Sequence, residues 1–473
     1  MQRRAFMKGI LGSSMAGLLP VAGCLKSGEH GQAAGGGHAA KRPNIIFLLT
    51  DDQRWDSLGC VNPILRTPNI DAMAADGVIF TNAYVTTAIC CTSRASFLTG
   101  QYARRHGIVD FARQFTDEQL AGTYPMLMKQ SGYRVGFVGK YGVGARDLPA
   151  ASYDFWEGWA GQGKYEGHTD ANGQPIHLTR LMGNQSLEFL DSCTARQPFC
   201  LSVSFKAPHC QDGDPRQFIY DPQHEAVYKD VTFPLPKTAT EADWQRLPEF
   251  LKTNNEARAR WEVRFSTPEK YQEMVRNYHR LIYGVDAEVG RIRRKLQEKG
   301  LADNTLIIFA GDNGFYLGEH GLAGKWYPHE ESIRVPLIIY DPRLPQSRRG
   351  NRQKAIALNI DLAPTMLHYA GIQAPAAIQG RDLSGLVEGR SVRWREDFFY
   401  EHLFEHNAIP KSEGVVGRRY KYVRWIDQKP VYEELYDLQS NPEETINFVN
   451  DPGYKEVLAA MRRRYEQLLA QAK

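Results

Sequence analysis

The stretch NIIFLLTDD, from Asn44 to Asp52, indicates the fold more directly than any other part of the sequence. A continuous apolar run of this kind is typical of a strand that is buried on both faces of a parallel sheet. The same pattern recurs at 305–313, where TLIIFAG is followed by Asp312 and Asn313. Further apolar runs predict strands at 133–139, 198–205 and 335–341.

Helical patterns separate these strands, and the longest of them covers 274–300. The alternation predicts an α/β fold with a large, mostly parallel central sheet flanked by helices. Residues 211–270 interrupt it with many Pro, Asp and aromatic residues, as expected for an active-site wall or a lid. The last part of the chain has short strand patterns and an amphipathic helix. We therefore expect a catalytic domain at 43–379 and a small C-terminal antiparallel sheet with a helix at 380–473.

The bulk composition is that of a soluble globular protein. The chain has 473 residues, with 42% hydrophobic and 24% charged residues and a formal charge of +4. Residues 1–23 contain Arg3, Arg4 and Lys8 and no acidic residue, so the remainder carries a charge of +1. No basic stripe with interleaved aromatic residues remains, and we expect no nucleic-acid partner.

Residues 1–23 combine two export signals in the expected order. RRAFMK resembles a twin-arginine motif, and VAGC resembles a lipoprotein box in which Cys24 becomes lipidated. The apolar part is too short and too rich in Gly for a membrane-spanning helix. A flexible Gly/Ala-rich tether follows at 24–42. We expect an exported protein in the periplasm or on the cell surface, held to the membrane by its lipid only; the alternative is an unstructured basic tail.

Cysteine usage does not predict a disulfide framework. The six cysteines other than Cys24 have no regular spacing, and twin-arginine cargo folds in a reducing cytosol before export. A bridge between Cys193 and Cys200, or between Cys200 and Cys210, remains open.

The ends of the two apolar strands carry the first candidate site. Asp51 and Asp52 follow one strand, and Asp312 and Asn313 follow the other. Ligands of open α/β sheets collect at the carboxyl ends of the strands. Three carboxylates and an amide oxygen suit Ca²⁺ or Mg²⁺ rather than zinc or copper. The alternative is that these residues only open turns after the strands.

The stretch ICCTSRASFLTG, from Ile89 to Gly100, carries the second candidate site. Cys90 and Arg94 lie four residues apart and share one face if the stretch is helical. The free amides at the start of such a helix favour an anion, and Arg94 would support that anion or a nucleophile at Cys90. Cys91 points elsewhere and is best explained as packing. A strained vicinal disulfide and a pair of soft metal ligands are the other interpretations.

The same stretch carries a family resemblance. Cys90 to Gly100 is similar to the motif of the type I, formylglycine-dependent sulfatases, in which Cys-x-Pro-x-Arg precedes Leu-Thr-Gly. Other segments resemble further family motifs, in the family's order, over nearly all of 43–473: TDDQRWDSLGC, GYRVGFVGKYG, KAPH, GDNGFYLGEHG, EESIRVPLIIYDP and ELYDLQSNPEE. The resemblance implies an alkaline-phosphatase-like α/β sandwich that hydrolyses sulfuric esters.

The resemblance also implies a role for each matching residue. Cys90 would be oxidised by a formylglycine-generating maturase, and the hydrate of the resulting formylglycine would be the nucleophile. The ligands of one divalent ion, usually Ca²⁺ in this family, would be Asp51, Asp52, Asp312, Asn313 and the modified residue 90. Arg94 would support the formylglycine, and His209 would protonate the leaving alcohol. Lys140 and Lys325 would bind the sulfate oxygens. The expected substrate is a sulfated carbohydrate.

Three of these residues have ordinary explanations when they are considered alone. Lys140 could be a solvated cap after a strand, His209 a structural histidine, and Lys325 part of an exposed salt bridge. Their joint arrangement near the proposed anion-binding edges favours catalysis.

The sequence departs from the family pattern at two positions. Thr92 stands where the family has proline, which implies less efficient maturation or a radical-type maturase. Gly142 stands where the family has the histidine of Lys-x-His, which assists collapse of the sulfate hemiester. That step is left without an assigned base, and His106 and His320 are the candidates to replace it.

Two other functions remain open at the level of the sequence. A phosphomonoester or phosphodiester hydrolase of the same superfamily would share the metal-binding strand ends but generally uses Thr or Ser as nucleophile. If Thr92 blocks maturation, the chain would be an inactive glycan-binding lipoprotein. Substrate specificity would come from segments 151–180 and 211–270. Candidates there for sugar contact, or alternatively for core packing, are Trp156, Trp159 and Trp261.

Overall fold

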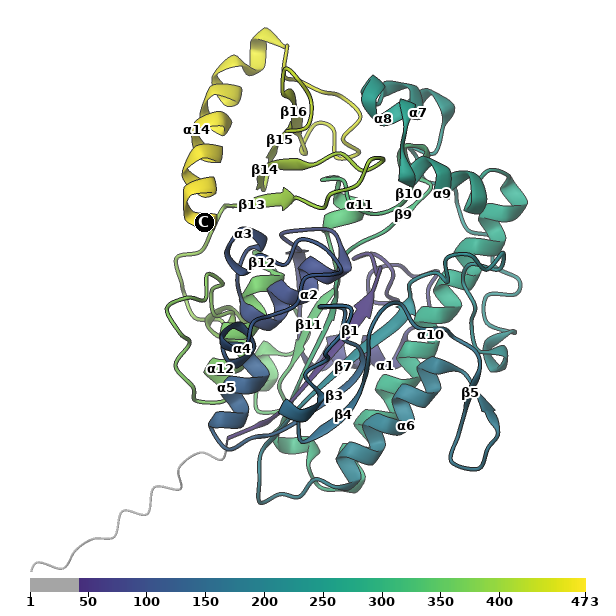
Figure 1. The fold of residues 1–473 in the computed structure, drawn as a ribbon, viewed down its shortest axis with the longest axis vertical. Helices are drawn as coiled ribbons and strands as arrows, with labels where there is room; N and C mark the ends of the chain where they lie inside the picture. The colour runs from purple at the N-terminus through teal and green to yellow at the C-terminus, as the bar shows by residue number, and fades with distance from the viewer. Residues whose placement is uncertain (1–41) are drawn as a thin grey trace, which may run out of the picture. The chain divides into compact units, whose positions relative to one another are not determined.

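An eight-stranded sheet with the order β12-β2-β11-β8-β1-β7-β3-β4 lies at the centre of this computed structural model, which describes residues 42–473 (Figure 1). Its strands are β1 (Asn44–Asp51), β2 (Val78–Tyr84), β3 (Arg134–Lys140), β4 (Phe155–Trp159), β7 (Phe199–Pro208), β8 (Thr305–Gly311), β11 (Leu337–Tyr340) and β12 (Asn351–Leu358). β1 is parallel to β7 and β8, β3 is parallel to β4 and β7, and β12 is parallel to β2. β11 is antiparallel to both its neighbours. The predicted large, mostly parallel sheet is confirmed.

Helices cover both faces of the sheet, because successive side chains of a strand point to opposite faces. In β1, Ile45, Phe47 and Leu49 pack into one core, whereas Ile46 and Leu48 pack into the other. The first core is covered by α2 (Cys90–Thr99), α5 (Tyr124–Gln130) and α12 (Leu362–Tyr369). The second is covered by α1 (Pro68–Asp76), α6 (Leu178–Asp191) and α10 (Pro268–Glu298). Burial on both faces explains why the central strands are continuously apolar.

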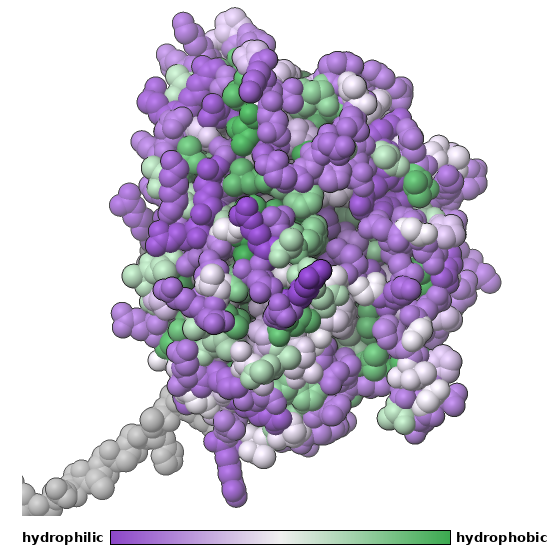
Figure 2. All heavy atoms as spheres, viewed as in Figure 1, coloured by the Kyte–Doolittle hydropathy of each residue, from purple (hydrophilic) through white to green (hydrophobic). Residues whose placement is uncertain are grey.

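The C-terminal part of the chain forms the predicted small antiparallel sheet. Its strands, in spatial order, are β13 (Asp397–His402), β14 (Ser412–Gly417), β15 (Tyr420–Trp425) and β16 (Tyr432–Asp437). Helix α14 (Lys455–Ala472) packs against it through Leu458, Tyr465 and Leu468 (Figure 1). On the face seen in Figure 2, hydrophilic residues predominate, and apolar residues form smaller groups between them.

The remaining elements are short. The helices are α3 (Ala103–His106), α4 (Asp117–Ala121), α7 (Glu241–Arg246), α8 (Glu249–Thr253), α9 (Glu256–Arg264), α11 (Glu330–Ile333) and α13 (Ser384–Val387), and the strands are β5 (His168–Thr169), β6 (Pro175–Ile176), β9 (Tyr316–Leu317) and β10 (Ala323–Gly324). Segment 211–270, whose sequence has no long period, contains the complete α-helices α7, α8 and α9 and the first residues of α10. Within residues 42–473 no helix is both long and apolar enough to span a bilayer.

The structure settles the question of the two disulfides but does not describe the N-terminal segment. Cys193, Cys200 and Cys210 are free and buried, so neither of the disulfides left open above is formed. The predicted signal at 1–23, the lipidation site Cys24 and nearly all of the predicted tether lie outside the described residues.

A buried lysine ties the small sheet to the rest of the protein. The side chain of Lys421, on β15, is fully buried, and its Nζ lies 3.0 Å from Glu330 Oε1 and 2.7 Å from Glu444 Oε1. It also donates to the Pro328 carbonyl at 2.8 Å. The carboxylate of Glu330 in turn accepts a hydrogen bond from Tyr84 on β2. One ammonium group therefore compensates two buried carboxylates that join the two sheets.

We expect Lys421→Met to destabilise the protein strongly, because both carboxylates would remain buried without their counter-charge. Loss of one partner of a buried ion pair costs about 3–5 kcal/mol of unfolding free energy. The midpoint of thermal or urea unfolding measures this loss. Lys354→Met, on the exposed part of edge strand β12, is the matched control and should leave the midpoint almost unchanged. Equal midpoints for the two variants would contradict the assigned role.

Candidate active site

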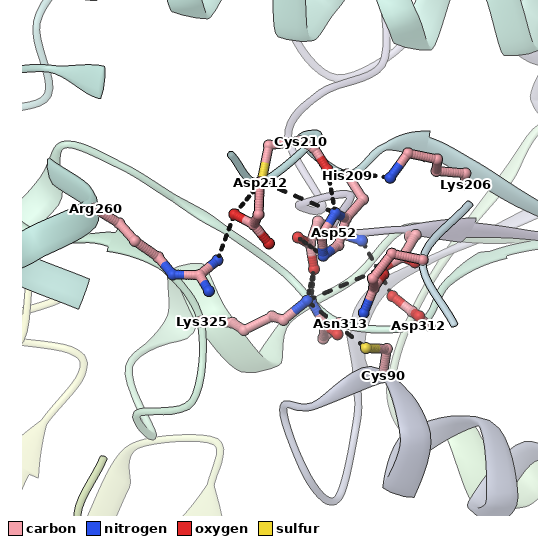
Figure 3. Close-up of polar contacts among 12 residues, drawn as sticks. Asp52, Cys90, Lys206, His209, Cys210, Asp212, Arg260, Asp312, Asn313 and Lys325 are labelled. Atoms are coloured by element: carbon pink, nitrogen blue, oxygen red, sulfur yellow. Dashed lines mark hydrogen bonds and ion pairs between the residues drawn. The ribbon is translucent and has the colours of Figure 1, made fainter. Parts of the chain in front are cut away.

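Four neighbouring strands bring the predicted polar residues to one edge of the sheet. β8, β1, β7 and β3 are adjacent and parallel, so their carboxyl ends lie side by side. β8 is followed by Asp312 and Asn313, and β1 ends in Asp51 and is followed by Asp52. β7 is followed by His209, and β3 ends in Lys140. In Figure 3, Asp52, His209, Asp312 and Asn313 converge with Lys325 and Cys90. The strand ends that carry the candidate residues therefore lie together at one edge of the sheet.

The three carboxylates and the amide of this edge are fully buried. Asp52 N donates to Asp312 Oδ1 at 3.1 Å, and Asn313 Nδ2 donates to Asp52 Oδ1 at 2.6 Å. Burial and the charge of Asp51 raise the pKa of Asp312 to about 7. Burial also opposes ionisation of Asp51, but Lys140 and the other neighbouring cations hold its pKa well below the ordinary value. Carboxylates packed this closely require positive charge between them.

The donor set fits a hard divalent cation. Asp51 Oδ1 and Asn313 Oδ1 are buried and accept no hydrogen bond from the described residues. Such orphan oxygens are costly unless a cation coordinates them. Together with Asp52 and Asp312 they form an all-oxygen set, the kind that Ca²⁺ and Mg²⁺ prefer. Asp52 also has a left-handed backbone (φ 63°), and its carbonyl accepts a hydrogen bond from Tyr278 Oη at 2.7 Å.

Three cationic side chains pair with the carboxylates. Lys140 Nζ binds Asp51, and Lys325 Nζ binds Asp52 Oδ1 and lies 3.9 Å from Asp51 Oδ1. Arg94 Nε donates to Asp312 Oδ2 at 2.8 Å, and Arg94 Nη2 lies 3.3 Å from Asp51 Oδ2. None of the three is exposed by more than a few per cent. Each of the three cationic residues named from the sequence therefore forms an ion pair with the acidic cluster, and none of them is a solvated surface residue.

Cys90 is the first residue of α2, so the helix on which the sequence argument depended is formed. Cys90 is 1% exposed, and its Sγ lies 4.0 Å from Lys325 Nζ. The unpaired amides and the dipole at this helix end favour a negative charge there. Cys91 is fully buried in a separate apolar cluster with Ile89 and Trp326, in agreement with a packing role. Both cysteines are free, so the vicinal disulfide is not formed.

His209 faces the acidic cluster from the end of β7. Its Nδ1 lies 2.6 Å from the Cys210 carbonyl, and its Nε2 lies 3.5 Å from Asp52 Oδ2. Because the carbonyl can only accept, Nδ1 carries the proton, and Nε2 is the atom directed at the site. Lys206 Nζ donates to the same carbonyl at 3.1 Å (Figure 3). Burial lowers the pKa of His209 well below its ordinary value.

Gly142 has a physical reason to be glycine. Its φ is +77°, and a Cβ at this position would lie 2.5 Å from Arg94 Cδ. Arg94 is held there by Lys140, whose carbonyl accepts from Nη1 at 2.5 Å, and by the Ser204 hydroxyl. The guanidinium stem therefore occupies the space that a side chain at position 142 would need.

Neither proposed replacement for the missing histidine lines the cavity over Cys90. His106 is buried, with Nε2 3.0 Å from Ser96 Oγ and Nδ1 accepting from Ile108 N. His320 stacks on His329 with 4.6 Å between ring centroids. The cavity wall contains a different histidine, His406.

The cavity over Cys90 has a volume of about 190 Å³. Other residues of its wall are Phe111, Gln162, Asp212, Glu256, Arg260, Trp326 and Phe404. Segments 151–180 and 211–270 contribute to it as predicted, but their tryptophans do not. Trp156 stacks on Phe137 at 5.0 Å, and Trp159 and Trp261 pack against the second core. The core interpretation of these three tryptophans is therefore the correct one.

Several site residues were not predicted from the sequence. Gln162 accepts a hydrogen bond from Lys140 Nζ at 2.6 Å, Ser204 binds Arg94, and Tyr278 fixes the backbone of Asp52. Ser204 lies in a mainly apolar strand beside the predicted site strands, and with Ser202 and Lys206 it is one of the few polar residues there. Gln162 and Trp326 lie in irregular segments whose course depends on tertiary packing.

The chain is similar to known proteins over most of its length. A family profile described as Sulfatase matches residues 43–372, and one described as N-sulphoglucosamine sulphohydrolase, C-terminal, matches residues 318–471. An N-acetylglucosamine-6-O-sulfatase of Bacteroides thetaiotaomicron is 28% identical, covering 90% of this chain and 87% of that protein. The N-acetylglucosamine-6-sulfatase of Homo sapiens is 27% identical, covering 95% and 88%. A solved structure in complex with its substrate D-glucosamine-2-N,6-O-disulfate has a TM-score of 0.80 and 26% identity, covering 91% and 98%.

We expect Ca²⁺ or Mg²⁺ to raise the midpoint of thermal unfolding. An ion that binds only the folded protein stabilises it by about 2.7 kcal/mol at a hundredfold excess over its Kd. Asp312→Asn removes one carboxylate of the set and should abolish most of this shift. Asp286→Asn is the matched control, because Asp286 is also buried but binds the amides of Asn69 and Ile70 instead. The proposed ion site would be ruled out by an equal shift in both variants. It would also be ruled out if adding the ion to the chelator-treated parent protein left its midpoint unchanged.

Proposed function

The chain belongs to the sulfatase family and hydrolyses sulfate esters, and from this premise we propose that it removes sulfate from a sulfated saccharide of the glucosamine 6-O-sulfate class. Two relatives similar to it along most of their length are named N-acetylglucosamine-6-sulfatases. A similar solved structure contains D-glucosamine-2-N,6-O-disulfate as its substrate. Sulfated sugars are therefore the first substrates to test.

The observation that carries the catalytic part of this proposal is the position of Cys90. Its side chain lies at the amino end of α2, beside Lys325, at the edge where the carboxylates of β1 and β8 converge. A nucleophile derived from this residue would be next to both a cation site and a set of oxyanion-binding groups. With a divalent ion on the carboxylates, the site would carry net positive charge, which suits an anionic ester such as a sulfate or phosphate ester.

We infer that Cys90 is converted by a maturase to formylglycine, and that the ion is Ca²⁺, or alternatively Mg²⁺. The formylglycine hydrate would supply the attacking hydroxyl. The ion would supply positive charge to that hydroxyl and to the sulfate. Its ligands would be Asp51, Asp52, Asp312, Asn313 and the modified residue 90.

The cationic side chains would bind and orient the sulfate group. Lys140 and Lys325 pair with Asp51 and Asp52 in the structure described here. An ion on these carboxylates would provide their counter-charge, and the ammonium groups could then donate to sulfate oxygens. Arg94 would remain a positioning residue, because its guanidinium already links the ends of β1, β3 and β8.

His209 would deliver the proton to the leaving alcohol. Its Nδ1 proton is held by the Cys210 carbonyl, so the proton that is transferred must come from Nε2, the atom facing Asp52. The negative charge of a bound sulfate ester would favour the protonated form against the effect of burial.

The remaining part of the proposal concerns export. The twin-arginine and lipoprotein patterns of residues 1–23 and Cys24 support a periplasmic or cell-surface enzyme, anchored by lipid. Such an enzyme meets sulfated carbohydrates outside the cytosol.

Thr92, at the proline position of the maturation motif, is buried on α2 with its hydroxyl 3.7 Å from Cys91 Sγ.

Maturation and substrate class are tested together. Coexpressed with a formylglycine-generating maturase, the protein should contain an aldehyde or its hydrate at residue 90, measured by mass spectrometry of the peptide that spans it. The matured protein should release sulfate from N-acetylglucosamine 6-sulfate, and Cys90→Ala should release none. Thr92→Pro should increase the modified fraction if the family motif governs recognition.

Other results would lead to different conclusions. An unmodified thiol with saccharide binding but no turnover would identify an inactive glycan-binding protein. Faster turnover of phosphate mono- or diesters than of any sulfate ester would contradict the substrate class.

A second prediction concerns proton transfer by His209. We expect His209→Gln to lower kcat on a sulfated saccharide by about 10²–10⁴-fold, the usual contribution of a general acid. An aryl sulfate should lose much less, because its phenolate leaves without a proton. His106→Gln is the control, since His106 is equally buried but lies outside the cavity. A similar loss on both substrates would show that His209 has only a structural role.

A further inference from the structure

A second cavity lies at the opposite end of α2 from Cys90. Its volume is about 520 Å³, within the range of ligand-binding sites, about 300–1,000 Å³. Its wall is formed by the segment around Arg381, the segment Arg393–Phe398 and the C-terminal part of α14, including Arg464. Tyr102, just beyond α2, closes one side. We call it the arginine cleft.

The charges of the arginine cleft do not balance. Arg464 forms a bidentate pair with Asp397, at 2.7 and 2.8 Å. Arg395 is almost fully buried and is paired with Asp361. Glu396, the other acid of the wall, lies 3.1 Å from Arg418. All the carboxylates at the cleft therefore already have partners.

Two guanidinium groups of the wall form no direct ion pair within the described residues. The side chains of Arg381 and Arg393 make no hydrogen bond or ion pair with any residue in the range 42–473. Both are exposed to solvent. Partial burial and the neighbouring charge of Arg395 lower the pKa of Arg381, although the nearby Asp361 acts in the opposite direction. A guanidinium group presents planar donors that suit oxyanions such as sulfate and carboxylate.

We propose that the arginine cleft is a second binding site, which holds anionic groups of a sulfated saccharide chain away from the residue being desulfated. This inference rests on the proposed function for the class of ligand. Arg381 and Arg393 would bind the sulfate or carboxylate groups. Trp394, half-buried and next to Arg393 in sequence, is fixed by a hydrogen bond from Nε1 to the Ile356 carbonyl at 2.7 Å and would offer an apolar ring face to a sugar.

The position of the cleft suits a polymer better than a single sugar. α2 has ten residues, a length of about 15 Å, with Cys90 at one end and the cleft beyond the other. Strand β13 also connects the two regions: its first residues line the cleft, and Phe404 and His406 beyond its end line the catalytic cavity. Six residues of strand extend about 20 Å. An oligosaccharide of several units is long enough to span this distance, whereas a monosaccharide is not.

The binding test uses the full chain with Cys90→Ala, so that no ligand is consumed. Fluorescence anisotropy with a labelled heparin decasaccharide gives the Kd in the parent and in Arg381→Gln/Arg393→Gln. Loss of two charge-assisted contacts should raise Kd about tenfold or more. The matched control is Arg66→Gln/Arg294→Gln, which removes the same charge from exposed positions on the α1 and α10 side of the sheet. Its Kd should stay at the parent value.

Each further outcome has a defined meaning. Equal Kd values in the two double variants would overturn the proposal. The proposal would also be overturned if Arg381 and Arg393 were required for binding phosphatidylglycerol vesicles but not for binding heparin. The cleft would then contact the membrane surface. Turnover of an aryl sulfate, measured with Cys90 intact, tests the proposed function separately. Arginine-dependent heparin binding without any turnover would support the cleft while contradicting the proposed catalysis.

Discussion

Repulsion among buried carboxylates is the constraint on which the rest of the site depends. Asp51, Asp52 and Asp312 lie next to one another because β1 and β8 pair in parallel with Thr50 opposite Gly311. Water cannot screen these charges, since the three side chains are essentially inaccessible. Every neighbouring element therefore contributes a positive or hydrogen-bonding group: β3 a lysine, α2 an arginine, the segment after β10 a lysine, and β7 a histidine. The site is an electrostatic solution to the packing of the sheet: three cationic side chains balance three carboxylates. A divalent ion on the carboxylates would add the positive charge that an anionic sulfate ester requires.

The part of this arrangement that could be predicted from sequence is the part that is encoded locally. An apolar run that ends in Asp51 and Asp52 defines both a buried strand and what lies at its end, and the same holds for Asp312. The spacing from Cys90 to Arg94 likewise predicts one helix face. Parallel pairing then needs no further information to bring these ends together, because crossovers return each strand in the same direction.

What could not be predicted depends on contacts between segments far apart in sequence. Trp156 alternates with solvent-facing residues and could equally well contact a sugar or the core; only the pairing of β4 with β3 brings it onto Phe137. Trp326 lines the catalytic cavity because of a left-handed backbone (φ 87°) in an irregular segment. The arginine cleft is a stronger case. Arg381 and Arg393 are ordinary surface residues in sequence, and their missing counter-charges become evident only when every nearby carboxylate has been assigned.

Gly142 illustrates why the loss of a motif residue need not be the loss of one group alone. A histidine here would require the space of the Arg94 side chain, whose Cδ would be 2.5 Å from the new Cβ. Arg94 in turn fixes Asp312, the Lys140 carbonyl and Ser204. Position 142 and residue 94 therefore cannot be considered independently. In this chain that space is occupied by the arginine that holds three strand ends together. Any base acting on residue 90 must therefore come from groups that already face the cavity, among which His209, His406, Asp212 and Glu256 can accept a proton.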